Sequence, residues 1–132
     1  MKKVVAIRGA VCTENTKEDI ILNVCNMVNE IILKNKLEKE DLISLHFTVT
    51  KEITKLNPAT ALRKGKLLTD ITDVALFCSQ EAYIENGMKN VIRLMLHTYM
   101  DENLKKQNVY LNGAQKLRPD YSDFSSDSEV LI

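Results

Sequence analysis

The chain of 132 residues is poor in the residue types on which several classes of function depend. It contains no Trp, only 5% aromatic residues, and 18 acidic against 18 basic residues, so its formal net charge is zero. A protein that binds nucleic acid usually carries a basic excess, and a single-strand binder also needs aromatic platforms on which bases stack. The composition therefore argues against nucleic acid as a partner.

Motifs for metal ions and phosphate groups are equally scarce. The two histidines and three cysteines are scattered along the chain, without the C-x-x-C or paired-histidine spacing typical of a zinc site. The four glycines are also dispersed and form no G-x-G-x-x-G or G-K-[ST] loop. We therefore expect neither a metal nor a cofactor.

Cysteine usage and hydropathy indicate a cytoplasmic protein. Cys12, Cys25 and Cys78 are odd in number, which argues against a disulfide framework and favours reduced thiols. The first apolar stretch is interrupted at Arg8, too early for the core of a signal peptide. Because no apolar run approaches the roughly 18 residues of a membrane span, we expect no membrane association.

Hydrophobic periodicity predicts a single α+β domain over residues 1–121 and a mobile Ser- and Asp-rich tail over 122–132. Thr16 and Asn57 are the predicted helix N-caps, the latter followed by a proline at the first helical position. Helices are predicted over 17–36 and 59–66, a helical turn within 101–107, and strands over 3–8, 42–50, 74–78, 91–99 and from 109 to 111. The order β-α-β-α-β-β-β predicts a mixed five-stranded sheet with two helices on one face.

Three local features refine this prediction. Gly9 and Ala10 are expected to let the first strand end in a tight exit, and Asn112-Gly113 predicts a turn. Alternation in the second strand places four apolar side chains on one face: Ile43, Leu45, Phe47 and Val49. The sheet face away from the helices is expected to carry Val5, Ile7, Val91 and Met95. Since two helices cannot cover that face, we expect sheets from several chains to associate into a closed oligomer.

Arginine is much less frequent than lysine in this chain. Fourteen lysines supply most of the positive charge, and the four arginines are Arg8, Arg63, Arg93 and Arg118. Arg8 and Arg93 lie within the apolar stretches VVAIRGA and NVIRLML. A guanidinium binds carboxylates through two parallel hydrogen bonds and stays charged when partly desolvated. Each arginine alone also fits an ordinary paired surface cation, but together they predict a site for a small anion that carries carboxylates.

Few other groups accompany these arginines. Cys78 fits a buried structural thiol better than a nucleophile paired with histidine, and Glu81 also fits an ordinary solvated carboxylate after a strand. With Tyr110, such a set can hold a dicarboxylate and stabilise charge that develops in a transition state. This chemistry suits a unimolecular rearrangement, which needs no nucleophile, cofactor or metal.

Six short motifs then occur in a familiar order: AIRGA, PATALR, CSQE, IRLML, VYL and LRPD. With these motifs the chain resembles the AroH-class chorismate mutases, the monofunctional bacterial type, over essentially its whole length. The resemblance implies a homotrimer whose sheets form a pseudo-α/β-barrel with active sites at the subunit interfaces. It also implies the Claisen rearrangement of chorismate to prephenate, a step in the biosynthesis of phenylalanine and tyrosine.

The resemblance also implies roles for individual residues. Arg93 would contact the ether oxygen of chorismate, and Glu81 with Cys78 would hydrogen-bond the ring hydroxyl. Arg8 and Tyr110 would bind a carboxylate. The remaining substrate-binding positions would form the wall and mouth of the pocket: Arg63, Arg118, Phe77, Asn57, Ala59, Thr60 and Leu117.

The chain departs from the family pattern at three of these positions. Asn57 replaces a frequent aromatic residue, Thr60 a common lysine and Phe77 a common threonine, and the segment 64–73 is about three residues longer. These changes bear on substrate affinity more than on the reaction. Two alternatives stay open: a same-fold trimer that hydrolyses imines, and a non-catalytic binder of small metabolites.

Overall fold

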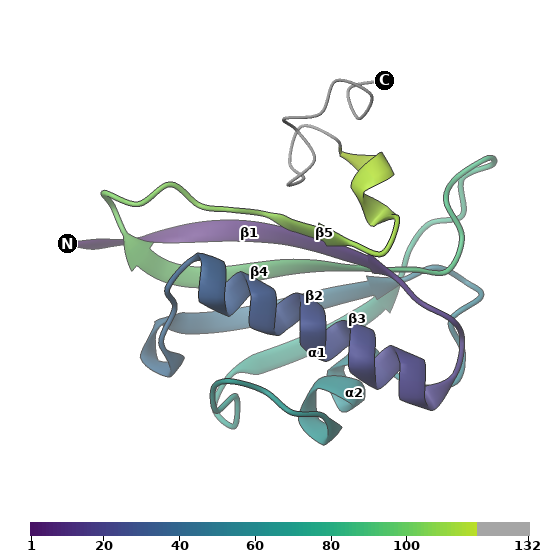
Figure 1. Ribbon diagram of the computed structural model, residues 1–132, viewed down its shortest axis with the longest axis horizontal. Coiled ribbons are helices and arrows are strands. Elements are labelled where there is room, and N and C mark those ends of the chain that lie inside the picture. Colours follow the sequence, from purple (N-terminus) through teal and green to yellow (C-terminus); the bar gives the residue numbers. More distant parts are fainter. Residues whose placement is uncertain (119–132) are drawn as a thin grey trace.

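The computed structural model describes residues 1–118 and has the predicted order of helices and strands (Figure 1). The elements are β1 (Lys2–Cys12), α1 (Lys17–Lys34), β2 (Leu42–Val49), α2 (Pro58–Lys64), β3 (Ala75–Gln80), β4 (Val91–Asp101) and β5 (Val109–Leu111). Two short 3₁₀ helices, η1 (Lys39–Asp41) and η2 (Ala114–Leu117), add to them. The predicted mobile tail, 122–132, lies outside the described residues.

The strands form one mixed sheet, as predicted, in the order β3-β2-β4-β1-β5. β4 lies near the middle and runs antiparallel to both β1 and β2, whereas β2–β3 and β1–β5 are parallel pairs. Two strands distant in the sequence therefore become neighbours at the centre of the sheet. This arrangement places the side chains of β1 and β4 next to one another.

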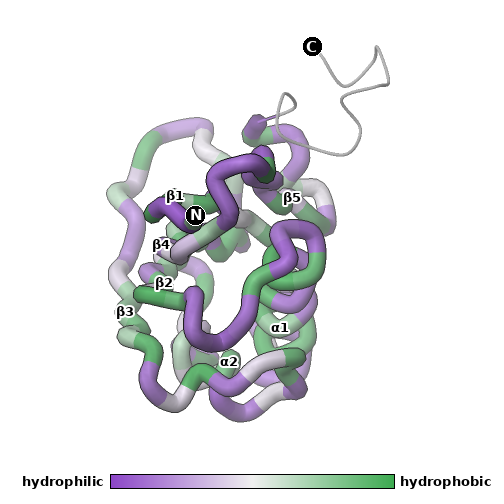
Figure 2. The backbone as a smooth tube through the Cα atoms, turned by 90° about the vertical axis from the view of Figure 1, so that its left-hand side faces the viewer, coloured by the Kyte–Doolittle hydropathy of each residue, from purple (hydrophilic) through white to green (hydrophobic). Residues whose placement is uncertain are grey.

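Both helices pack on the same face of the sheet, which confirms the predicted layering (Figures 1 and 2). Each begins at its predicted N-cap: Thr16 Oγ1 accepts a hydrogen bond from Asp19 N, and Asn57 Oδ1 accepts one from Ala59 N at 2.8 Å. Glu18 and Asp19 in the first turn of α1 also favour the helix dipole. None of the helices described within residues 1–118 is long and apolar enough to span a bilayer.

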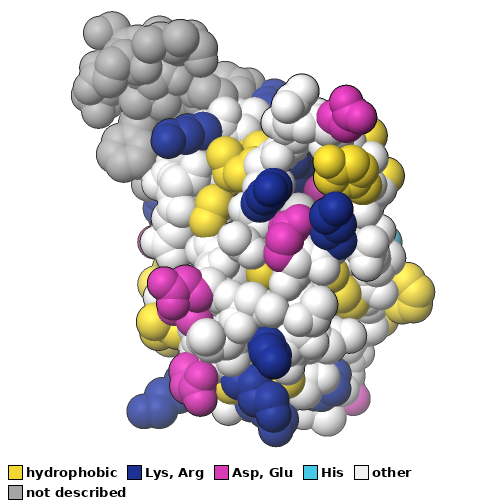
Figure 3. All heavy atoms as spheres, turned by 90° about the vertical axis from the view of Figure 1, so that its right-hand side faces the viewer, with side chains coloured by type: hydrophobic (Ala, Val, Ile, Leu, Met, Phe, Trp, Pro, Cys, Tyr) yellow, Lys and Arg dark blue, Asp and Glu magenta, His cyan; other side chains and the backbone are white. Residues whose placement is uncertain are grey.

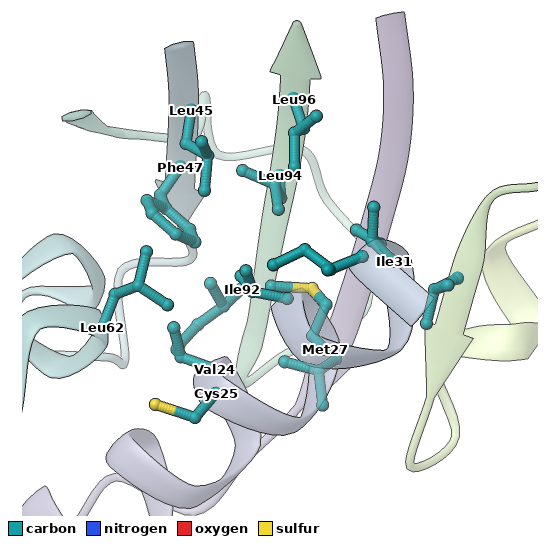
Figure 4. Packing of buried hydrophobic residues seen from close by; sticks show 14 of the residues in the cluster. Val24, Cys25, Met27, Ile31, Leu45, Phe47, Leu62, Ile92, Leu94 and Leu96 are labelled. Carbon is teal, nitrogen blue, oxygen red and sulfur yellow. The ribbon is translucent and has the colours of Figure 1, made fainter. Parts of the chain in front are cut away.

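The main core lies between this helical layer and the sheet (Figure 4). From α1, Val24, Met27 and Ile31 are fully buried, and Leu62 of α2 meets the same cluster. The sheet contributes alternate residues of its strands: Ile7, Val11, Leu45, Phe47, Ile92, Leu94 and Leu96. Burial of these side chains is the main source of stability, at about 1.5–3 kcal/mol for each large apolar group.

Two sequence predictions about β1 were wrong. The strand does not end at Gly9 but continues to Cys12, paired with β4 throughout. Gly9 serves close packing instead, because a Cβ there would lie 3.0 Å from Ile31 Cδ1 and 3.1 Å from Met27 Sδ. Val5 and Ile7 pack into the helix-side core rather than on the opposite face, so their predicted orientation was wrong.

The start of β2 holds a second correction. A register shift between Leu42 and Ser44 interrupts the ladder with β4, and Ile43 is left 38% exposed instead of facing the core with Leu45 and Phe47. A bulge of this kind turns one side chain out of the regular alternation. In 101–107, where a helical turn was predicted, the chain forms a single hydrogen-bonded turn, Leu104 N to Asp101 O at 3.1 Å, and no helix.

Candidate functional site

A pocket of about 590 Å³ opens on the sheet face opposite to the helices. Its volume lies within the range of small-molecule sites. The residues that line it come from four strands and the segments that follow β3 and β5: Arg8, Gly9, His46, Thr48, Glu81, Arg93, Leu94, Met95, Tyr110, Leu117 and Arg118. Six of the predicted site residues therefore meet in one cavity: Arg8, Glu81, Arg93, Tyr110, Leu117 and Arg118.

The pairing of β1 with β4 brings the first two arginines together. Arg8 lies opposite Met95 and Ala10 lies opposite Arg93, so the two arginines are diagonal neighbours on one face. Ile7, Val11, Ile92 and Leu94, which alternate with them, point into the core. The apolar sequence around each arginine thus reflects a strand with one buried face, while the guanidinium reaches the pocket.

Glu81 reaches the same place from the end of β3. Its backbone N donates to Val49 O at 2.9 Å, which extends the β2–β3 ladder by one residue. Its Oε1 accepts a hydrogen bond from Thr48 Oγ1 at 2.7 Å and pairs with Arg93 Nε at 2.8 Å. The carboxylate side chain is 22% exposed and the Arg93 side chain 47% exposed, so the ion pair is held at the pocket surface rather than in the core.

The segment after β4 closes the other side of the pocket. β5 pairs in parallel with β1, which places Tyr110 beside Ala10, and Arg8 N donates to Asn108 Oδ1 at 2.8 Å. Tyr110 is nearly buried. The predicted turn at Asn112-Gly113 is present, since both residues have positive φ, 54° and 93°, and it leads into η2. Leu117 and Arg118, at the end of that short helix, line the pocket.

Two predicted residues on β3 lie away from the pocket lining. Cys78 packs against the helix-side core, where burial raises the pKa of its thiol and keeps it protonated at neutral pH. Phe77 points to the other face and is 66% exposed, with its ring in edge contact with His46 at 5.3 Å between centroids. Neither residue contributes to the pocket within one described chain.

Four further predicted residues lie at α2, on the helical side of the sheet. Asn57 caps α2, Ala59 is buried, and Thr60 Oγ1 accepts a hydrogen bond from Arg63 Nη2 at 3.3 Å. None of them lines the pocket formed by Arg8 and Arg93. The predicted site residues therefore divide into a pocket group and an α2 group that a single described chain does not bring together.

Sequence reasoning missed two polar residues that line the pocket, His46 and Thr48. Both lie on β2 and alternate with Leu45, Phe47 and Val49, which face the core. The alternation assigned them to the polar face, but nothing in the sequence indicated that Arg93 and Glu81 would lie beside that face. The pairing of Thr48 with Arg93 across β2 and β4 supplies this information.

The charged side chains of the pocket determine which kind of ligand it suits. No group of three or more potential metal ligands occurs among residues 1–118. On the face shown in Figure 3, basic and acidic side chains lie interspersed rather than in a patch of one sign. Among residues 1–118, the lining of the pocket departs from this balance, because Arg8, Arg93 and Arg118 accompany one carboxylate, Glu81. A local excess of guanidinium groups in a cavity suits a small anion.

The sequence profile of the type I chorismate mutases matches residues 4–121. The chain belongs to this family. It is 31% identical over 118 residues to chorismate mutase AroH of Bacillus subtilis, covering 88% of this chain and 91% of the relative. Chorismate mutase AroH of Thermus thermophilus is 31% identical over 120 residues, covering 86% and 93% of the two chains. These matches confirm the family that the six sequence motifs predicted.

A solved structure supports the same assignment at the level of the fold. The chorismate mutase from Clostridium thermocellum superposes with a TM-score of 0.72 at 35% sequence identity, covering 84% of this chain and 97% of that one. The likeness confirms the predicted α+β fold with a mixed five-stranded sheet and two helices. The coverage shows that this chorismate mutase fold accounts for nearly the whole described domain.

Proposed function

We propose that this family member catalyses the Claisen rearrangement of chorismate to prephenate. The observation that carries the proposal is the meeting of Arg8, Arg93, Glu81 and Tyr110 in one pocket. Chorismate has two carboxylates, a ring hydroxyl and an ether oxygen, and these four side chains offer a partner for each kind of group. Because the rearrangement is unimolecular, orientation and charge stabilisation supply the whole catalytic effect.

Each side chain takes one part in the reaction. Arg93 directs its guanidinium to the ether oxygen, where negative charge grows as the C–O bond breaks. Glu81 accepts a hydrogen bond from the ring hydroxyl, and Arg8 with Tyr110 holds a carboxylate. Arg118 adds positive field at the mouth of the pocket. Cys78 contributes through its backbone, because its protonated thiol packs against the core.

The α2 group becomes part of the site when a second copy of the chain is added. We propose a homotrimer in which Asn57, Ala59, Thr60 and Arg63 of one subunit complete the pocket of the next. The open sheet face supports this arrangement, since Val4, Phe77 and Tyr99 are 56%, 66% and 45% exposed in one chain. Such side chains are better buried between subunits than left in water.

The three free cysteines also favour the reducing environment of the cytoplasm.

A chorismate assay tests this function directly. Purified protein, treated with a chelator and without added cofactor, should consume chorismate and form prephenate faster than the uncatalysed reaction. Light scattering on the same sample should give the mass of three 15.0 kDa chains. A trimer that binds chorismate without converting it would favour the non-catalytic alternative, and turnover of an imine instead of chorismate would favour the deaminase.

A further inference from the structure

Thr48 occupies a special position between the two charged residues at the centre of the pocket. It lies on β2, directly across from Arg93 on β4, while the other neighbour of β2 is β3, which leads to Glu81. Its hydroxyl donates to Glu81 Oε1 at 2.7 Å, and the same oxygen pairs with Arg93 Nε at 2.8 Å. One carboxylate oxygen thus receives both contacts.

These contacts leave some atoms of the ion pair for a ligand to bind. In the part of the chain that the structure describes, the Glu81–Arg93 pair uses Oε1 and Nε only. Oε2 and the two terminal nitrogens of the guanidinium therefore stay available to substrate. An arginine and a carboxylate otherwise favour a two-pronged pair, in which both oxygens would be occupied by the guanidinium.

We propose that Thr48 is a positioning residue that keeps this ion pair in its one-oxygen form. The hydroxyl comes from a regular strand inside the sheet, so its place is fixed better than that of either long charged side chain. By donating to Oε1, it sets the rotation of the carboxylate and keeps Oε2 toward the pocket. A surface ion pair without such a third partner holds its geometry weakly, because both side chains gain rotamer freedom.

This inference rests on the proposed function, and variants at Thr48 test it separately. Thr48→Val preserves the β-branched shape and removes the hydroxyl, whereas Thr48→Ser keeps the hydroxyl and removes a methyl group. We expect Thr48→Val to lower kcat by about 10- to 100-fold, the range for a lost hydrogen bond to a charged group. KM should change by less than about threefold, and Thr48→Ser should stay within about threefold of the wild type in kcat.

A double-mutant cycle distinguishes positioning of Glu81 from a general effect on the strand. In a Glu81→Ala background the hydroxyl has lost its acceptor, so Thr48→Val should cost less than about twofold in kcat/KM. Thr98→Val is the matched control: the Thr98 hydroxyl is buried on the core face and donates to Asp41 O at 3.0 Å. It should lower the melting temperature and leave kcat unchanged.

The results of these experiments distinguish a failure of the proposed function from a failure of the role proposed for Thr48. If the wild type does not rearrange chorismate above the uncatalysed rate, the proposed function fails before Thr48 is tested. If the wild type is active, three results would each overturn the role of Thr48: an unchanged kcat in Thr48→Val, an effect confined to KM, or an equal loss in the two backgrounds. A loss that Thr48→Ser does not repair would also overturn it, since the hydroxyl would not be the cause.

Discussion

The two faces of the sheet differ in the burial and the polarity of their side chains. On the helical face, alternate residues of β1, β2 and β4 are fully buried, among them Ile7, Phe47 and Leu96. On the open face, other residues of the same strands, Arg8, Thr48 and Arg93, line the pocket. Stability and chemistry are thus carried by the same strands but by different side chains, because successive residues of a strand point to opposite faces. Substitutions on the two faces should therefore affect different measurements.

The largest expected effect falls on the helical face. Phe47→Ala would leave a cavity beneath α1 and α2, where Phe47 is completely buried, and should lower the free energy of unfolding by about 3–5 kcal/mol. Urea denaturation measures this loss. The folded fraction should retain the kcat of the wild type at low temperature. A stable variant with a greatly reduced kcat would show that the two faces are not separable.

Arg93→Ala tests the open face and should have the next largest effect. It removes the donor assigned to the breaking ether bond, so kcat should fall by about 10²–10³, as for one lost oxyanion donor. The melting temperature should stay close to that of the wild type, because the side chain is 47% exposed and its ion pair lies at the surface. A change confined to KM would show that Arg93 binds the ground state only.

The smallest effect is expected for a substitution in α2. It tests whether the site is complete in one chain or shared between subunits. Thr60→Lys adds the cation that the family resemblance implies at this position and should lower KM for chorismate by up to about fivefold, or about 1 kcal/mol. The lysine can act only if α2 of one subunit reaches the pocket of another. Lys64→Thr, at the end of α2, removes one positive charge and tests whether the net charge of the helix alone changes KM. An unchanged KM in Thr60→Lys would argue against a shared site.

Much of the fold was predictable because the chain carries strong local signals. Thr16 and Asn57-Pro58 marked the starts of both helices. The errors lie where tertiary contacts override such signals. Gly9 looks like a strand end in the sequence, yet the close approach of Met27 and Ile31 requires a residue without a side chain within the strand. Ile43 follows the alternation, but the bulge turns it outward.

The site was predicted less evenly than the fold. Arg8, Glu81, Arg93 and Tyr110 meet in the pocket, and the apolar stretches around Arg8 and Arg93 were visible in the sequence. Thr48 could not be singled out, since one threonine in an alternating strand has no distinctive pattern. Cys78 lies on the core face of β3. That placement depends on the register between β2 and β3, which the sequence does not specify.

Residue types and their periodicity were enough to determine the class of the fold and the helix boundaries within a few residues, and they predicted a ligand of anionic character. These properties depend on local backbone preference, burial of apolar faces and the chemistry of arginine. Tertiary structure alone decided that Arg8 and Arg93 become diagonal neighbours and that Thr48 and Arg93 share one oxygen of Glu81. Arg8 and Arg93, and Thr48 and Glu81, are more than 30 positions apart in the sequence, and only the pairing of the strands brings them together.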